Sequence, residues 1–188
     1  TGIFSFDKVY VTAAYGGQTR IYYGDDFSSL SLLYTTPVGD RTSSTFCVFD
    51  DNVCLFNLNS IAENSLMVSS ISAIDMPTRI SAPVFNDIVV CKNRVFGCRK
   101  KQIRACANDD ITNWDYNLEL DVPGDRAYFQ RVEARSEFIA CTNYKDHAIF
   151  FTADEMFELY GNDADSFGFQ KIADLGCVNR HAVCEVGG

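Results

Sequence analysis

The stretch QIRACANDDITNW, residues 102–114, contains the pattern that decides the fold. Apolar and polar residues alternate from Ile103 to Ala107, as they do in a β-strand with one buried face. The alternation stops at the acidic run NDD, residues 108–110, and Trp114 follows. An acidic run in this position is either a metal or catalytic site or a turn between two strands, and its recurrence along the chain favours one of the two.

Two other stretches follow the same order. TRIYYGDDFSSLSLL, residues 19–33, and EMFELYGNDADSFGFQKI, residues 155–172, each run from a β-type segment through an acidic turn into a second apolar segment. Their separations fit a unit of about 40–50 residues built from short strands, which is the repeat length of propeller blades. Recurrence favours turns over a functional acidic site. The acidic residues that we interpret as turn residues on this basis are Asp25, Asp26 and Asp109.

The composition indicates a folded core and argues against two classes of partner. Of the 188 residues, 47% are hydrophobic and 13% aromatic, which is atypical of a disordered chain. The net charge of −9 argues against nucleic-acid binding, which needs a basic stripe. The one dense basic cluster, residues 99–101, lies between two strand-like runs, as a hairpin tip would. No apolar run approaches the roughly 20 residues of a membrane span, and no signal-peptide pattern is visible. We therefore expect neither nucleic acid nor a membrane as partner.

The eight cysteines lie mostly within β-type runs, beside Val, Phe, Ile or Ala. A free buried cysteine behaves as a small hydrophobic residue. No CxxC pair is present and the chain has only two histidines, which argues against a zinc site. We expect reduced core thiols, in a chain made in a reducing cytoplasm.

Strand-like segments of four to eight residues follow one another along the chain, separated by turn residues. Residues 86–120 align with residues 136–174, and each stretch contains four strand segments in meander order, which is the composition of a propeller blade. We predict an all-β protein, a β-propeller of about four to five four-stranded antiparallel blades, with a β-sandwich as the alternative. The approximate blades are 1–37, 38–77, 78–123 and 124–175, and 176–188 is expected to be an inner strand of a closing or truncated blade.

Residues 94–114 and 147–188 carry a family resemblance. Over these stretches the chain resembles the β-propeller domains of virion proteins of tailed phages and prophages, of the tail or head-to-tail joining type. The matching positions are Arg94–Gly97, Ile103–Trp114, Phe151-Thr152, Tyr160-Gly161, Phe167–Ile172 and Gly176–Val178. The resemblance covers about residues 87–188. The first half of the chain has only the same general pattern of short strands and turns.

This resemblance implies a non-enzymatic structural or assembly role that works by protein–protein contact. The implied partners are other virion or tail proteins. The implied localisation is the host cytoplasm during assembly and then the virion, or the bacterial cytoplasm for a prophage product.

A weaker resemblance links Asp109 and Trp114 to the Asp-box, the S-x-D-x-G-x-T-W hairpin of sialidase-like propellers. Ala107, Ile111 and Asn113 replace its Ser, Gly and Thr, so two positions match and no sialidase activity is implied. In such a hairpin the Asp accepts hydrogen bonds from turn N–H groups and the aromatic ring packs between neighbouring units. We expect the same of Asp109 and Trp114.

The remaining candidate residues point to no reaction centre. The chain contains no GxSxG, HExxH, P-loop or GxGxxG motif, so we expect no catalytic residues, no enzyme and no cofactor. Phe167 is grouped with the turn and seam residues. Asp163 and Asp165 alternate as Ca²⁺ ligands do, but lack the downstream Gly and bidentate Glu of an EF-hand, and are weak Ca²⁺ candidates. A glycan- or ligand-binding propeller remains the alternative function, ahead of a glycosidase-like enzyme.

Overall fold

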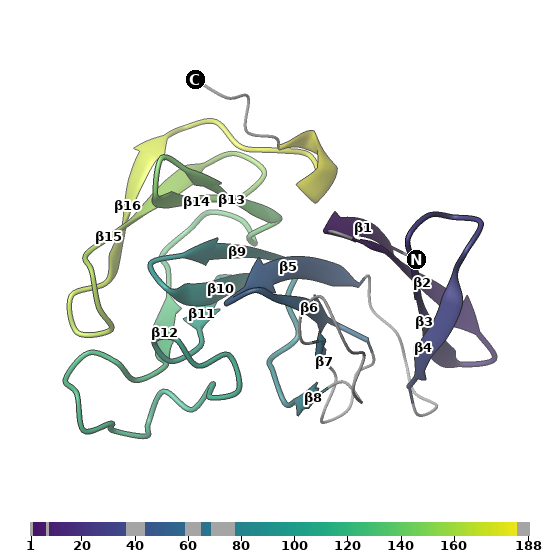
Figure 1. The fold of residues 1–188 in the computed structure, drawn as a ribbon. Helices are drawn as coiled ribbons and strands as arrows, with labels where there is room; N and C mark the ends of the chain where they lie inside the picture. The colour runs from purple at the N-terminus through teal and green to yellow at the C-terminus, as the bar shows by residue number, and fades with distance from the viewer. Residues whose placement is uncertain (1, 7, 37–43, 59–64, 69–77, 184–188) are drawn as a thin grey trace. The chain divides into compact units, whose positions relative to one another are not determined.

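The computed structural model describes residues 2–6, 8–36, 44–58, 65–68 and 78–183. These residues contain strands β1 to β16 and one short 3₁₀ helix, and no α-helix occurs among them (Figure 1). The strands form four sheets, each of four antiparallel strands. The chain divides into two compact units, Thr1–Val84 and Phe85–Gly188, each with two of the sheets. The all-β prediction is therefore confirmed.

No helix in the described ranges has the length and apolar character needed to cross a membrane.

Unit 1 contains two sheets in meander order. The first sheet is made of β1 (Gly2–Phe6), β2 (Lys8–Tyr15), β3 (Gln18–Gly24) and β4 (Ser31–Thr35). The second is made of β5 (Thr45–Phe49), β6 (Asn52–Phe56), β7 (Ser65–Val68) and β8 (Thr78–Ile80). The two sheets share a buried cluster that includes Ile21 and Leu55, and the Thr19 hydroxyl donates a hydrogen bond to the Leu58 carbonyl (2.8 Å). An apolar face on each sheet is thus covered by the other sheet.

Unit 2 repeats the arrangement with two further sheets. The third sheet is made of β9 (Asp87–Cys91), β10 (Arg94–Arg99), β11 (Gln102–Ala105) and β12 (Tyr128–Arg131). The fourth is made of β13 (Ala140–Tyr144), β14 (His147–Phe151), β15 (Met156–Tyr160) and β16 (Gly168–Ala173), and the 3₁₀ helix η1 (Arg180–Ala182) follows. One buried cluster joins the two sheets, with edge-on ring pairs such as Phe138 on Phe157 and Phe150 on Phe169.

The first strands of these two sheets, β9 and β13, lie side by side (Figure 1). Hydrogen bonds link them: the Asn143 side chain donates to the Val90 carbonyl (3.0 Å), and the Asp87 carboxylate accepts from the Cys141 N–H (2.9 Å). Burial raises the pKa of Asp87, since an ionised carboxylate there is only partly solvated. The junction between the two sheets is therefore apolar along the faces and polar along the first strands.

Tight two-residue turns close several hairpins of both units. The pairs Gly16-Gly17, Asp50-Asp51, Lys92-Asn93 and Lys145-Asp146 all have positive φ, as the hairpin turns that match the twist of the strands require. Gly, Asn and Asp adopt this conformation more easily than other residues, which explains most of the sequence at these turns. The lysines at 92 and 145 adopt it at some cost in backbone strain.

Two strands lie beyond the approximate blade ends that were expected from the sequence. Strand β8 begins at Thr78, just beyond the expected blade end at residue 77, and β12 lies beyond the expected end at residue 123. The segment NLEL, residues 117–120, was expected to be the fourth strand of its blade and is an irregular loop instead. Its alternation of apolar and acidic residues imitates a strand, but no strand of the described chain pairs with it.

The C-terminal expectation and the cysteine expectation have different outcomes. In place of the inner strand expected over 176–188, residues 176–183 contain η1 and no strand, and residues 184–188 lie outside the described part. The described cysteines, among them Cys98 and Cys141 on facing sheets, are buried and free, as expected of core thiols.

Candidate functional site

Two of the three acidic runs form the same self-contained turn after the third strand of a sheet. In the β3–β4 turn, Asp26 Oδ1 accepts hydrogen bonds from Ser28 N (2.8 Å) and Ser29 N (3.0 Å). In the β15–β16 turn, Asp163 Oδ1 accepts from Asp165 N (3.1 Å) and Ser166 N (2.9 Å). Hydrogen bonds from these serines lower the pKa of both aspartates. Their carboxylates therefore hold the turns together.

A glycine begins each of these turns for a steric reason. A Cβ on Gly24 would lie 2.7 Å from the Ser29 carbonyl oxygen, and one on Gly161 would lie 2.3 Å from the Ser166 carbonyl oxygen. Gly161 also has φ +88°, a conformation that other residues rarely adopt. The G-x-D-x-x-S pattern at 24–29 and 161–166 is thus one structural motif used twice.

In the third acidic run, after β11, the turn acceptor is not the residue that was expected. Asp110 Oδ1, one residue beyond Asp109, accepts from the backbone N–H (2.9 Å) and the hydroxyl (2.6 Å) of Thr112. Asp109 has φ 52°, donates its own N–H to the Asn93 carbonyl (2.9 Å), and accepts from the Asn108 side chain (3.3 Å). The acceptor of turn N–H groups is therefore Asp110, and Asp109 supplies the left-handed backbone position.

The other acidic candidates have separate partners. Asp25 forms an ion pair with Lys8 (2.6 Å) at the surface. Asp165 Oδ1 forms an ion pair with Arg126 (2.5 Å), whereas Asp163 Oδ1 is occupied by turn hydrogen bonds. The two weak Ca²⁺ candidates are thus directed at different partners, and no group of three metal-ligating side chains is found among the described residues.

The two aromatic candidates lie in different surroundings. The Trp114 indole N–H donates to the Ile111 carbonyl (2.7 Å), and its ring lies 5.3 Å from that of Phe85, within the part of the chain that forms the third sheet. Phe167, in the β15–β16 turn, packs edge-on against Phe96 (5.4 Å) and Tyr128 (5.3 Å) of the third sheet. Phe167 therefore lies at the seam between the two sheets of unit 2.

A long loop, residues 106–127, connects β11 to β12 where the fourth sheet has only the short turn of residues 161–167. Its base is held by Arg94, which is 1% exposed. The guanidinium donates to the carbonyls of Cys106, Gly124 and Arg126, each at 2.7 Å. It also lies over the Phe167 ring, 5.6 Å from its centre. One buried side chain thus joins both ends of the loop to the seam.

Burial determines the protonation of the groups at the base of the long loop. It lowers the pKa of the Arg94 guanidinium, whose two terminal nitrogens donate to carbonyl oxygens instead of to a carboxylate and whose Nε has no hydrogen-bond partner. Burial also raises the pKa of the neighbouring Cys106 thiol to about 12, so this sulfur stays protonated at neutral pH and is a poor nucleophile. The base of the loop is therefore a structural clamp.

The outer part of the loop, residues 115–123, is exposed throughout, and we call it the exposed segment. Apolar side chains occur at every second position from Tyr116 to Val122, and Leu118 and Val122 are 49% and 57% exposed. Asn117, Glu119 and Asp121 lie between them and Asp115 precedes them, without a basic residue. Soluble surfaces seldom expose apolar side chains in such a group without a binding role.

The middle of the exposed segment also leaves backbone groups unpaired. The turns on either side are closed by hydrogen bonds from Leu118 N to the Asp115 carbonyl (3.2 Å) and from Asp125 N to the Val122 carbonyl (3.2 Å). Among the described residues, the N–H and C=O groups of 119–121 have no hydrogen-bond partner. These exposed groups are open to hydrogen bonding by solvent or by another chain.

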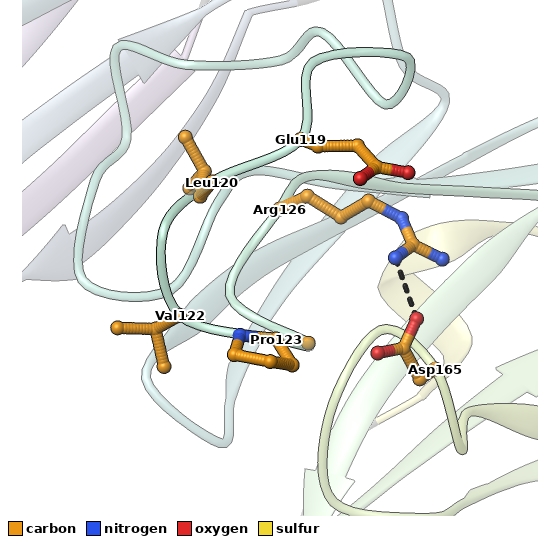
Figure 2. A pocket seen from close by; sticks show the side chains of 7 residues that line it. Glu119, Leu120, Val122, Pro123, Arg126 and Asp165 are labelled. Atoms are coloured by element: carbon orange, nitrogen blue, oxygen red, sulfur yellow. Dashed lines mark ion pairs between the residues drawn. The ribbon is translucent and has the colours of Figure 1, made fainter.

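A pocket of about 320 Å³ lies between this segment and the β15–β16 turn, and Figure 2 shows its lining. Glu119 and Arg126 extend toward Asp165 on one side, and Leu120 and Val122 lie on the other. The volume is at the lower end of the range for small-molecule sites. The pocket therefore offers a long side chain both an apolar wall and a carboxylate.

Most of the residues that build this site were not among the sequence candidates. Arg94 belonged to a matching stretch but had no role, and Arg126 and Glu119 were not singled out. The alternation of residues 116–122 was visible, but it was interpreted as a strand. Its lack of any basic residue before Pro123 is the one feature of the sequence that could have suggested a binding segment.

Comparisons with known proteins returned no relative. No family model, no curated protein and no solved structure matches the chain.

Proposed function

We propose that the chain is a non-enzymatic module that works by protein–protein contact, with the exposed segment 115–123 as its contact surface. The observation that supports this most is a run of nine exposed residues in which apolar and acidic side chains alternate above a rigid, Arg94-clamped base. A surface used only for solvation would not need Leu118, Leu120 and Val122, because exposed apolar side chains add no stability.

We propose further that the four sheets are blades of a β-propeller in a phage or prophage particle. Two features support the ring: four consecutive four-stranded meanders, and the adjacency of first strands within each unit, β1 with β5 and β9 with β13. The particle setting rests on the sequence resemblance alone. A crystal structure with four sheets around one axis supports the ring, and sheets packed as two layers without such an axis contradict it.

The contact function is tested by selecting binders from a random peptide library displayed on a carrier. The bait is the wild-type chain, and the matched bait is the triple variant L118S/L120S/V122S, which keeps the charge. Peptides that are enriched on the wild-type bait but not on the triple-variant bait support the proposal. Enrichment that is identical on both baits contradicts it.

A glycan-binding function is the second candidate, and one observation favours it. The Tyr116 ring stacks on Phe129 (5.0 Å) with the Arg104 guanidinium close to both rings, and Tyr116 remains 37% exposed. Exposed aromatic rings beside carboxylates are suited to sugar binding. A glycan array separates the two functions: specific retention that is lost in the variant Y116A replaces the contact proposal with this one.

A further inference from the structure

We infer that the partner of the exposed segment is an extended strand of another protein in which Lys or Arg alternates with apolar residues. This inference rests on the proposed contact function and specifies its ligand. It follows from three independent properties of the segment: its free backbone groups, the alternation of its side chains, and the sign of its charge.

The backbone argument concerns residues 119–121. Their N–H and C=O groups have no partner within the described chain, and both flanks are fixed by turns and by the Arg94 clamp. An extended peptide can pair with such a stretch by main-chain hydrogen bonds, which is the recognition mode called β-augmentation. Pre-organisation by the clamp reduces the entropy that binding has to overcome.

The side-chain argument concerns the alternation of apolar and polar residues along the exposed segment, which repeats every two residues. In an extended pairing, residues 118, 120 and 122 lie on one face and residues 119 and 121 on the other. When the segment pairs in extended form, a partner strand meets apolar residues on one face and carboxylates on the other, whereas in the free chain Glu119, Leu120 and Val122 line one pocket. Cross-strand pairs of matched type stabilise the pairing, and like charges opposite each other weaken it. A strand that alternates apolar and basic residues satisfies both faces.

The pocket adds a specific place for one basic side chain. Leu120, Val122 and Pro123 form an apolar wall, and Glu119 provides a carboxylate beside the Arg126–Asp165 ion pair. Lys and Arg side chains pack their methylene stems on apolar surfaces and keep the charged group at a polar edge. Arg126 is already held by Asp165, which leaves Glu119 as the acceptor for the incoming charge.

The charge argument favours a different protein over a second copy of this chain. Two copies each carry a net charge of −9, so their approach is opposed by repulsion. The exposed segment contains three acids and no base, which would steer a basic partner to it. Self-association of the chain is therefore treated as an outcome that would overturn the inference.

The test uses fluorescein-labelled peptides of eight residues with blocked ends. The probe alternates Lys with Val, and a control peptide has the same composition with the four Lys at one end and the four Val at the other. Anisotropy titrations at 0.15 M salt are expected to show about tenfold tighter binding of the probe, a difference of about 1.4 kcal/mol. Two further probes carry backbone N-methyl groups, one at its odd-numbered residues and the other at its even-numbered residues. They test the main-chain pairing, because an N-methyl group removes a hydrogen-bond donor, and one of the two probes is expected to lose binding.

Matched variants locate the site. E119Q/D121N and L118S/L120S/V122S are each expected to weaken probe binding about tenfold or more, because contacts at the centre of an interface dominate affinity. The controls E133Q/E137Q and L32S/L175S remove exposed residues of the same types elsewhere and are expected to leave binding unchanged. Sedimentation of the chain alone is expected to show a monomer.

Three results would overturn the inference: equal binding of both peptides, binding that ignores the segment variants, or a self-associated chain whose segment is protected by another copy. These are distinct from failure of the proposed function. If library selection yields peptides that depend on the segment but lack the basic alternation, the contact function stands and this ligand is wrong. If no peptide depends on the segment, the contact function itself fails.

Discussion

The third and fourth sheets share one framework but connect their last two strands in different ways. The β15–β16 turn, residues 161–167, is held by hydrogen bonds between Asp163 and Ser166 and by one from the Ala164 N–H to the Gly124 carbonyl (3.0 Å), and it buries Phe167 in the seam. The β11–β12 loop, residues 106–127, depends on Arg94 for its base and leaves its outer part exposed. The short connection is needed for stability of the sheet, whereas the outer part of the long one is free to serve binding.

This difference separates two uses of similar sequence. Both connections begin with an acidic run after a β-type segment, and both contain an Asp side chain that accepts turn N–H groups. Beyond that point the short turn returns to the sheet at once, and the long loop continues with alternating residues that contact little of the protein. Local turn chemistry is therefore shared, and the contact function that we propose is assigned to the additional residues.

The largest expected effect is that of R94M. The variant removes three hydrogen bonds to carbonyls of the loop base, at a cost of about 1–3 kcal/mol for each buried group left unsatisfied. The Gly124 carbonyl still accepts from the Ala164 N–H (3.0 Å). We expect the free energy of unfolding in urea to fall by about 3 kcal/mol or more, with faster proteolysis between residues 106 and 127. R99M, at an exposed position, should change it by less than about 0.5 kcal/mol. Equal effects of the two variants would show that the loop base needs no clamp.

The next effect tests the short turn through Gly161. Alanine at this position would have φ +88° and a Cβ 2.3 Å from the Ser166 carbonyl oxygen. We expect G161A to destabilise by about 2–3 kcal/mol, because strained backbone positions of this kind cost about 1–3 kcal/mol each. G16A is the matched control: Gly16 has φ +55° but nothing within 4 Å of a Cβ, and its cost should be about 1 kcal/mol. Thermal unfolding of both variants makes the comparison.

A smaller, pH-dependent effect is expected from the Asp163 carboxylate. Hydrogen bonds from Ser166 lower its pKa in the folded chain, so its contribution to stability is present above the unfolded pKa of about 3.9. That contribution is lost as the pH falls through the lower folded value. D163A should therefore melt below the wild type at pH 7, and the two melting temperatures should converge as the pH falls through the lowered pKa of Asp163. D121A, which removes an exposed carboxylate outside such a turn, is the matched control.

The smallest expected effect is the most informative about the long loop. L118S/L120S/V122S removes exposed side chains, so the free energy of unfolding should change by less than about 0.5 kcal/mol at each position. Urea denaturation of the variant and the wild type measures this. A loss of several kcal/mol would mean that these residues pack in the native protein, and the contrast between the two connections would disappear.

The sequence predicted the strands well because their cause is local. β-branched and aromatic residues in short runs, separated by Gly, Asp and Asn turns, are sufficient to indicate four-stranded meanders. The recurrence of the acidic run also led to the turn interpretation, although the acceptor after β11 is Asp110 and not Asp109. Weak Ca²⁺ binding by Asp163 and Asp165 was suggested by spacing alone, which does not show that their carboxylates have other partners.

The site was harder to predict because it depends on contacts between distant residues. Arg94 reaches Gly124 and Arg126 only after β10 and β12 are in the same sheet, and nothing near Arg94 in sequence indicates those carbonyls. The NLEL segment has the period of a strand, so pattern alone places it in the sheet. Whether such a segment pairs depends on whether an edge is free beside it, which is a property of the tertiary structure.

Hydrogen–deuterium exchange of residues 115–123, with and without the alternating Lys-Val peptide, tests the central claim most directly. In the free chain the amides of 119–121 should exchange rapidly, since they have no partner, and those of 163–167 should exchange more slowly. With the peptide bound, protection should appear at 119–121 and remain unchanged at 163–167. Peptide binding without new protection at 119–121, or slow exchange there in the free chain, would contradict the account of this segment as a loop whose backbone is open to pairing with another chain.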